Sequence, residues 1–135
     1  MKLLAGVKGT GKTKALIEEV NKVCGESNGS VVCVEKGKKL TFDLTYHARL
    51  VNSEEYGITN GDMLYGFLCG ILSANYDITE IFIDGAYAIC EERVEELECF
   101  LKKAARITKL NNVECLVTAS VDPAMLSEEV RAFLA

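Results

Sequence analysis

Several residue types that build reactive sites are scarce or missing from this chain of 135 residues. It has no tryptophan and no glutamine, one proline, and one histidine, His47. None of its six cysteines forms a C-x-x-C pair, so the spacing typical of a zinc site is absent. Most of the cysteines lie within apolar runs, which predicts reduced thiols buried in the core. With no partner residue in view for His47, histidine-based acid–base chemistry is a poor candidate.

Long apolar runs are missing too. The first one ends at the glycines and lysines of residues 6–14, which is unlike a signal peptide. No stretch approaches the roughly 20 apolar residues that a membrane helix needs. Hydrophobic residues still make up 49% of the chain, enough for a sizeable core. We therefore expect a soluble, cytoplasmic protein with one domain over residues 1–135.

Basic residues do not dominate the chain, whose net charge is −5. This balance disfavours a general nucleic-acid-binding surface, because such surfaces depend on many lysine and arginine contacts to phosphate. The positive charge is instead concentrated near the start of the chain. The first 14 residues contain four lysines and no acidic residue: Lys2, Lys8, Lys12 and Lys14.

The apolar patterns predict strands that alternate with helices. The expected strands cover residues 2–6, 31–34, 49–51, 81–83 and 113–119, with a hairpin or short edge strand at residues 40–44. The expected helices cover residues 12–24, 61–74 and 91–110, and a closing helix follows Asp122-Pro123. This alternation predicts an α/β domain with three layers, α/β/α, around a mainly parallel sheet of about five strands. Within the second helix, Gly66 and Gly70 predict close packing against a neighbouring element.

One loop carries the clearest chemical pattern, G-x-x-x-x-G-K-T. It follows the first expected strand and opens the first expected helix, the context in which this pattern predicts phosphate binding. Its glycines allow consecutive N–H groups to point at an anion, and the helix start adds the positive end of a dipole. A lysine supplies a mobile charge, and a threonine hydroxyl is placed to ligate Mg²⁺. The predicted phosphate-binding residues are Gly6, Val7, Lys8, Gly9, Thr10, Gly11, Lys12 and Thr13.

A second candidate for the metal site is Asp84. It directly follows the apolar run Ile81–Ile83, so its carboxylate should lie at the carboxyl end of a strand. The glycine-rich loop leaves the sheet at that same edge, where ligands bind in parallel α/β sheets. Thr13 and Asp84 are thus the predicted Mg²⁺ ligands.

With these two motifs the chain resembles the P-loop NTPases, through residues 3–20 and 80–85. Within that superfamily it is similar to a minimal RecA-like or thymidine-kinase-like core, and to small proteins described only as ATP-binding. The resemblance implies a P-loop NTPase fold and binding of ATP, or another NTP, with Mg²⁺. It also makes Ser120 a candidate sensor of the γ-phosphate, although Ser120 could equally cap the last helix. The zinc ribbon, paired Asp-Glu and substrate loop of thymidine kinases are missing.

The catalytic residues are less clear. Gly85 stands where many ATPases of this superfamily have a glutamate after the aspartate, and no glutamine is present to orient water. Several acids could substitute, and the sequence selects none of them: Glu54, Glu55, Asp62, Glu91 and Glu92. Among the arginines, Arg49 is the better candidate for an arginine finger, although a solvated edge charge is the favoured interpretation. A solvated turn explains the lysines around Gly37 better than a phosphate contact does; these are Lys36, Lys38 and Lys39. We interpret Tyr46 and His47 as loop residues.

These observations favour a weak or partner-activated ATPase. Two alternatives stay open: a nucleotide-dependent binding module without turnover, and, less favoured at this size, a small nucleotide kinase. We expect a protein partner or self-association, because small acidic domains of this kind commonly work through another subunit.

Overall fold

Five short apolar segments form a single parallel sheet. The computed structural model describes residues 1–38, 43–44 and 47–135. The strands are β1 (Lys2–Ala5), β2 (Ser30–Glu35), β3 (Ala48–Asn52), β4 (Ile78–Asp84) and β5 (Glu114–Ala119). They lie in the order β1-β5-β4-β2-β3, and all neighbouring pairs are parallel. The predicted parallel sheet is therefore confirmed.

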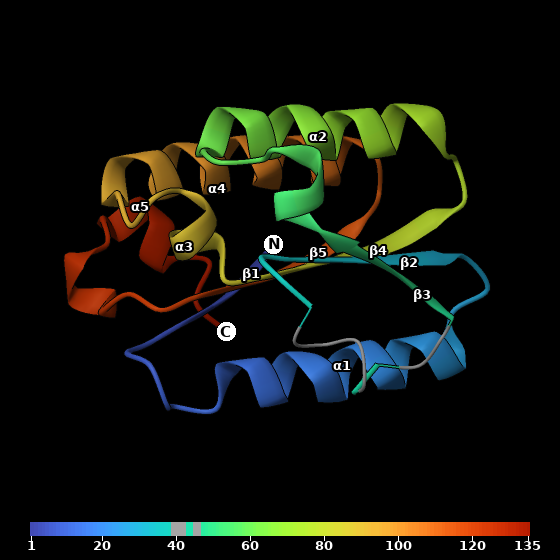
Figure 1. The fold of residues 1–135 in the computed structure, drawn as a ribbon, viewed down its shortest axis with the longest axis horizontal. Coiled ribbons are helices and arrows are strands. Elements are labelled where there is room, and N and C mark those ends of the chain that lie inside the picture. The colour runs from blue at the N-terminus through green and yellow to red at the C-terminus, as the bar shows by residue number, and fades with distance from the viewer. Residues whose placement is uncertain (39–42, 45–46) are drawn as a thin grey trace.

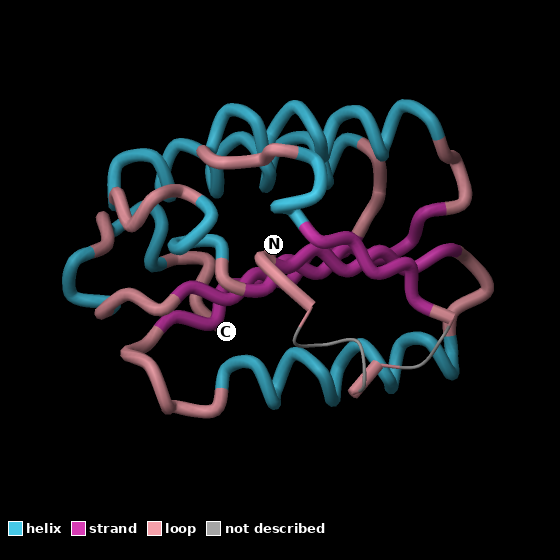
Figure 2. The backbone as a smooth tube through the Cα atoms, viewed as in Figure 1, coloured by secondary structure: helices cyan, strands magenta, loops and turns pink. Residues whose placement is uncertain are grey.

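Helices cover both faces of this sheet (Figures 1 and 2). The α-helices are α1 (Lys12–Glu26), α2 (Gly61–Ala74), α3 (Ala86–Ile89), α4 (Val94–Leu110) and α5 (Glu128–Arg131). Two 3₁₀ turns, η1 (Ser53–Tyr56) and η2 (Pro123–Met125), complete the described elements. Helix α1 lies on one face, and α2 and α4 lie on the other. The mixed α/β class and the layered arrangement agree with the three-layer prediction.

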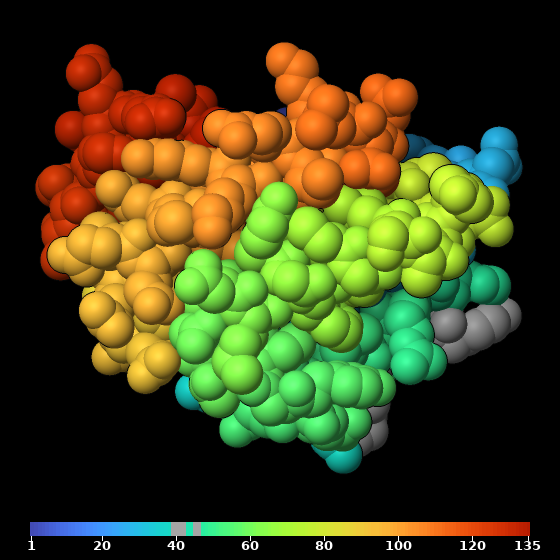
Figure 3. All heavy atoms as spheres, turned by 90° about the horizontal axis from the view of Figure 1, so that it is seen from above, coloured from blue at the N-terminus to red at the C-terminus, as the bar shows by residue number. Residues whose placement is uncertain are grey.

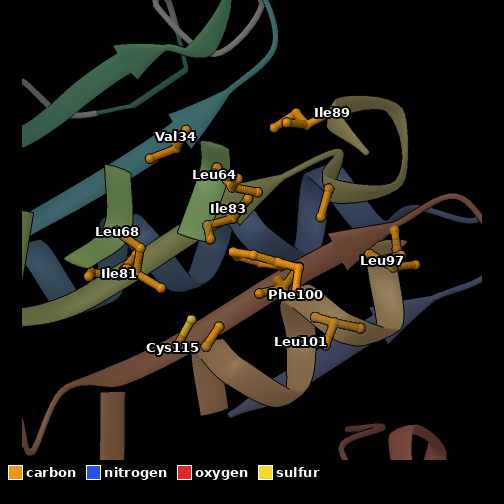
Figure 4. Close-up of a cluster of buried hydrophobic side chains, with 14 of the residues drawn as sticks. Val34, Leu64, Leu68, Ile81, Ile83, Ile89, Leu97, Phe100, Leu101 and Cys115 are labelled. Atoms are coloured by element: carbon orange, nitrogen blue, oxygen red, sulfur yellow. The ribbon is translucent and has the colours of Figure 1, made fainter. Parts of the chain in front are cut away.

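Most of the buried apolar surface lies between the sheet and the pair α2 and α4. Side chains from β4, α2 and α4 converge there, as Figure 4 shows for Ile81, Leu68 and Phe100. All three are at most 2% exposed. Seen from above, α2 and α4 lie side by side along this face (Figure 3). Burial of so many large side chains is the main driving force for folding.

The opposite face has a smaller core. Leu16 and Val20 of α1 are fully buried there against Cys33 of β2 and Phe82 of β4. These residues alternate along each strand with residues of the other cluster, because successive side chains of a strand point to opposite faces.

The C-terminal residues run along the outer edge of β1. The Leu3 N–H donates to the Phe133 carbonyl oxygen at 2.8 Å, and the Ala135 N–H donates to the Leu3 carbonyl oxygen at 3.0 Å. Leu3 and Leu134 form an isolated parallel bridge. These bonds satisfy backbone groups that an edge strand otherwise leaves unpaired.

The long helix begins later than the sequence indicates. A helix from Glu91 was expected, but α4 starts at Val94 after the separate short helix α3. Glu91 and Glu92 between them have φ angles of 59° and 56°. That left-handed conformation cannot continue a right-handed helix.

The predicted close packing at Gly66 and Gly70 is wrong. Both glycines are exposed, and a Cβ added at either would meet nothing within 4 Å. Part of the hairpin or edge strand expected at residues 40–44 lies outside the described residues, as do Lys39 and Tyr46. Asp43 and Leu44 are described, and they form a turn and a bend.

The prediction for the cysteines holds for half of them. Cys33, Cys90 and Cys115 are buried, Cys24 and Cys69 are half-buried, and Cys99 is exposed; all six are free thiols. Across the described ranges, none of the helices combines the length and apolar character needed to cross a bilayer.

Candidate functional site

A row of polar side chains crosses the carboxyl ends of three neighbouring strands. In the strand register, Glu35 of β2 is paired with Asp84 of β4. The β4–β5 pairing ends at Ile83 and Val117, so Asp84 and Thr118 are the next residues on each strand. Because side chains alternate along a strand, all three face the layer that contains α1. The row therefore lies beside the first turn of that helix.

Hydrogen bonds join this row to α1. The Thr13 hydroxyl, in the first turn of α1, donates to Asp84 Oδ1 at 3.2 Å. The buried Thr118 hydroxyl donates to the same Oδ1 at 2.8 Å and accepts from the Gly85 N–H at 2.9 Å. The Asp84 carboxylate is thus held by hydroxyl groups from two different elements. Thr13 and Asp84, the two residues predicted to ligate Mg²⁺, are thus in direct contact.

The glycine-rich loop, residues 6–13, connects β1 to α1. Gly9 and Gly11 have φ angles of 85° and 83°, a conformation that favours glycine. Gly6 serves a different purpose, because a Cβ there would come within 3.0 Å of Thr10 Oγ1. The loop thus depends on all three glycines, two for backbone conformation and one for a close approach.

Lys12 folds back over this loop. Its ammonium group donates to the Val7 carbonyl oxygen at 3.0 Å and to Thr10 Oγ1 at 3.3 Å. The Thr10 hydroxyl donates to the same Val7 oxygen at 2.9 Å. These bonds are at an exposed position, so an anion entering the loop could compete for the ammonium group.

A cavity of about 460 Å³ opens between the loop and the polar row. Four lysines face two carboxylates in its lining, in a protein whose net charge is negative. The charged lining residues are Lys8, Lys12, Lys14, Lys36, Glu35 and Asp84. This local excess of positive charge suits a polyanionic ligand.

The buried thiol of Cys33 lies near the Asp84 and Glu35 carboxylates. Burial raises the pKa of Cys33 far above its usual range, and the nearby Asp84 and Glu35 carboxylates raise it further. A thiolate is the nucleophilic form of cysteine, so the raised pKa disfavours a nucleophilic role for Cys33 near neutral pH.

A second cavity, of about 400 Å³, lies on the other side of the loop. Gly6 and Thr10 line this one, and Gly11 and Lys12 line both. Apolar residues make up much of the rest of its lining, among them Leu4, Ala5, Ala15, Pro123 and Leu134. A polar and a mainly apolar cavity therefore meet at Gly11 and Lys12.

No protein-family model matches the chain, and no curated protein matches it at a significant level.

The structure brings most of the predicted site residues together. Lys8, Gly9, Gly11, Lys12, Thr13, Asp84 and Ser120 all line the larger cavity. Val7 contributes its carbonyl oxygen, while its side chain is 60% exposed. Ser120 does not cap the last helix: Asp122 caps the 3₁₀ turn η2, where its side chain accepts from the Ala124 N–H, and Ser127 caps α5, where its side chain accepts from the Val130 N–H.

The other acids considered for catalysis lie outside the cavity lining. Glu54 and Glu55 are exposed in η1, and Glu91 and Glu92 are exposed in the turn before α4. Asp62, at the start of α2, forms an ion pair with Lys103 at 3.6 Å.

Among the basic residues considered as site candidates, some lie in the cavity lining and others lie outside it. Arg49 is exposed on the edge strand β3, and His47 is exposed just before it. Lys38 pairs with Glu55 at 3.5 Å, whereas Lys36 lines the larger cavity. Of the two described lysines of this turn, Lys36 is therefore the one placed to contact an anion.

Sequence reasoning missed the roles of Thr118 and Glu35. Glu35 follows the apolar run Val31–Val34 just as Asp84 follows its own apolar run, and this shared pattern could have identified it. Glu35 is only 2% exposed yet lines the cavity. A buried carboxylate at a cavity wall is a frequent feature of catalytic sites.

Proposed function

We propose that this protein binds the Mg²⁺ complex of ATP, or of another nucleoside triphosphate, and hydrolyses it slowly or on activation by a partner. Its fold is then that of the P-loop NTPase superfamily, working in the cytoplasm. The observation that carries the proposal is the Thr13–Asp84 hydrogen bond, which joins the glycine-rich loop to the end of β4.

The loop supplies the phosphate-binding groups. The backbone N–H groups around Gly9 and Gly11 precede the first turn of α1, so the helix dipole adds to their attraction for phosphate. Lys12 exchanges its bonds to Val7 and Thr10 for bonds to phosphate oxygens. A charged donor forms stronger bonds to phosphate than to neutral oxygens, which makes this exchange favourable.

The residues present fit a magnesium ion. Mg²⁺ prefers oxygen ligands and usually takes only one or two from the protein, with the rest from water and substrate phosphates. The Thr13 hydroxyl and the Asp84 carboxylate would hold it, and Thr118 would fix the carboxylate. When bound, the ion neutralises charge that develops on the phosphoryl oxygens.

Glu35 is the proposed general base. Hydrolysis requires a water molecule oriented toward the terminal phosphoryl group and a carboxylate that accepts its proton. Glu35 lies in the cavity wall next to Asp84 in the strand register. It thus occupies the role for which the sequence alone provided no single candidate.

The mainly apolar cavity would hold the nucleoside. Its polar side chains are Thr10 and Lys12, and both also belong to the loop. Few groups are therefore available to distinguish one base from another by hydrogen bonding. We expect the affinities for the magnesium complexes of ATP, GTP and CTP to agree within about tenfold.

Binding is tested by calorimetry with Lys12→Ala. Loss of a charge-assisted hydrogen bond should weaken Mg-ATP binding by about 10- to 100-fold. Lys22→Ala is the matched control, because Lys22 is an exposed lysine of the same helix that does not line the cavity. Equal affinities of the Lys12→Ala variant and the parent would refute the assignment.

Turnover is tested by phosphate release with Glu35→Gln. Loss of a general base should lower the rate by about 10² to 10⁴-fold while Mg-ATP affinity is retained. Glu91→Gln, in an exposed position outside the cavity, should leave the rate unchanged. A parent protein that binds Mg-ATP but releases no phosphate would instead support the binding module, and transfer to an acceptor would support the kinase.

A further inference from the structure

Helix α1 covers only part of its face of the sheet. It is the one helix on that face within the described ranges, and it packs on β2, β4 and β5 (Figure 1). Leu4 of β1 and Leu116 of β5, which point to the same face, are only half-buried. The opposite face is covered along its length by α2 and α4. The β1–β5 side of the α1 face is thus left open.

A groove of about 480 Å³ occupies this open part. Leu4, Leu116 and Phe82 form its floor. Its wall is one side of α1, formed by residues Ala15, Glu19 and Val23 at a spacing of four. These wall residues extend over about 12 Å of helix axis, or a little more than two turns. The groove is therefore long, shallow and apolar at its base.

The rim of this groove is acidic. Glu19 of α1, Glu80 of β4 and Glu114 of β5 line it, and Lys2 is the single basic residue among the lining residues. Burial raises the pKa of Glu80, and the nearby Glu114 and Glu19 carboxylates raise it further, while Lys2 opposes them. The Glu114 and Glu19 carboxylates thus disfavour the charged form of Glu80, and a cation brought to the rim would offset this effect.

We propose that this groove binds a basic amphipathic helical segment of a partner protein. The segment lies beside α1 and places apolar side chains on Leu116 and on Leu4, a residue that the groove shares with the mainly apolar cavity. Its lysine or arginine side chains reach the carboxylates of Glu19, Glu80 and Glu114. Such a segment adds the helix that would cover the rest of this face, since an apolar sheet face is stable when another element packs on it.

Other occupants fit the groove less well. Nucleic acid would be repelled by the carboxylates. Across the described part of the chain, no group of three acidic, cysteine or histidine side chains is close enough to hold a metal ion. Two copies meeting groove to groove would oppose their acidic rims, in a protein of net charge −5. Long, flexible basic side chains can reach separated carboxylates, which a single ion cannot do.

The test uses the isotope-labelled full chain, without nucleotide, and a synthetic 18-residue peptide of leucine, alanine and lysine patterned as an amphipathic helix. We expect the peptide to shift the backbone amide signals of residues 2–4, 15–23 and 114–116. A peptide with glutamate in place of every lysine serves as the charge control and should not bind.

Paired variants locate the interaction. Glu19→Lys should weaken peptide binding about tenfold, because it reverses a charge at the rim. Glu18→Lys, the same change one residue earlier on α1, affects an exposed residue outside the groove and should leave the affinity unchanged. Thermal melts check that both variants fold. Glu114→Lys, at an exposed position of β5, replaces Glu19→Lys if that variant does not fold.

Several results would overturn the proposal. These are absence of shifts at millimolar peptide, equal binding of the glutamate peptide, and shifts confined to another surface. Equal effects of Glu18→Lys and Glu19→Lys would also overturn it. Self-association of the chain alone would overturn it as well, if sedimentation detects a dimer and the same amide signals shift with protein concentration. A second copy would then be the occupant of the groove.

Discussion

Thr118 connects groups that the proposed chemistry needs in fixed positions. Its side chain is 2% exposed, and its hydroxyl bonds both Asp84 Oδ1 and the Gly85 N–H. The hydroxyl therefore orients the carboxylate and satisfies a backbone donor at the end of β4. Sequence reasoning favoured Ser120, two residues later, as the polar residue of this strand that acts in the site. Strand alternation gives Thr118 and Ser120 the same face, so the pattern alone could not choose between them.

Replacing Thr118 with valine keeps the shape of the side chain and removes its hydroxyl. We expect Thr118→Val to lower the free energy of unfolding by about 1–3 kcal/mol, because the Gly85 N–H loses its partner in a part-buried position. Urea titration measures this change. Thr118→Ser retains the hydroxyl and should be much less destabilising; equal losses for both variants would show that the methyl group matters and the hydroxyl does not.

Glu80 makes the stability of the protein depend on pH. Burial, then Glu114 and Glu19, raise the pKa of this carboxyl in the folded protein. The folded state therefore holds the Glu80 proton more tightly than the unfolded state, and it loses stability as pH rises from the ordinary carboxyl pKa to the raised value.

Glu80→Gln removes this titration. We expect the variant to be more stable than the parent at pH 7, with the gain disappearing below about pH 4, where Glu80 is protonated in both states. Urea titrations at several pH values measure the difference. Glu18→Gln, at an exposed position of α1, is the control and should change little. A gain that persists unchanged at low pH would contradict the electrostatic explanation.

At the scale of elements, the start of α2 was predictable and the start of α4 was not. Asn60 precedes α2, and its side chain accepts from the Met63 N–H at 2.9 Å, as expected of an N-cap. Before α4, two glutamates continue the helical composition, and no glycine or proline marks the left-handed turn that they form. Helix propensity is a weak preference that tertiary contacts override, so a sequence pattern alone extends the helix too far.

The same reasoning explains which parts of the site could be predicted. The glycine-rich loop and Asp84 follow local patterns, in which residue type and neighbouring strand are visible in the sequence. Glu35 becomes a site residue only because β2 lies next to β4, a pairing of segments far apart in the chain. The position of Gly66 and Gly70 likewise depends on which side of α2 meets α4.

The turn between α3 and α4 is expected to be strained. A non-glycine residue in the left-handed conformation costs roughly 1–2 kcal/mol, which exceeds the entropic cost of glycine. Glu92→Gly should therefore raise the free energy of unfolding by about 0.5–1 kcal/mol. Glu95→Gly, three residues later within α4, should instead lower it by about 1 kcal/mol. Chemical denaturation measures both, and a loss of stability in Glu92→Gly would show that the glutamate makes a compensating contact.

At the scale of the whole molecule, the six free thiols differ in burial and therefore in expected reactivity. Burial raises the pKa of Cys90 and of Cys115 to about 12 and raises that of Cys33 further. Little thiolate forms at these positions near neutral pH, whereas Cys99 is exposed. The folded protein should thus contain one thiol that is much more reactive than the rest.

Labelling with a disulfide reagent at pH 8 measures this difference. We expect one fast phase in the native protein, which Cys99→Ser removes, and slow reaction at the half-buried Cys24 and Cys69. The three buried thiols should react only on unfolding, when all six become available. Fast native labelling of a second thiol would indicate local opening of the fold.

Adjacent residues at the end of β4 point to opposite faces of the sheet. Ile83 belongs to the large apolar cluster on one face, and Asp84 belongs to the polar row on the other face. A substitution at Asp84 therefore changes the polar row and leaves the side chains of the large apolar cluster unchanged. The larger apolar cluster lies on one face of the sheet, and the polar row lies on the other face beside the smaller core under α1. A substitution of Asp84 should therefore require few compensating substitutions in the large apolar cluster.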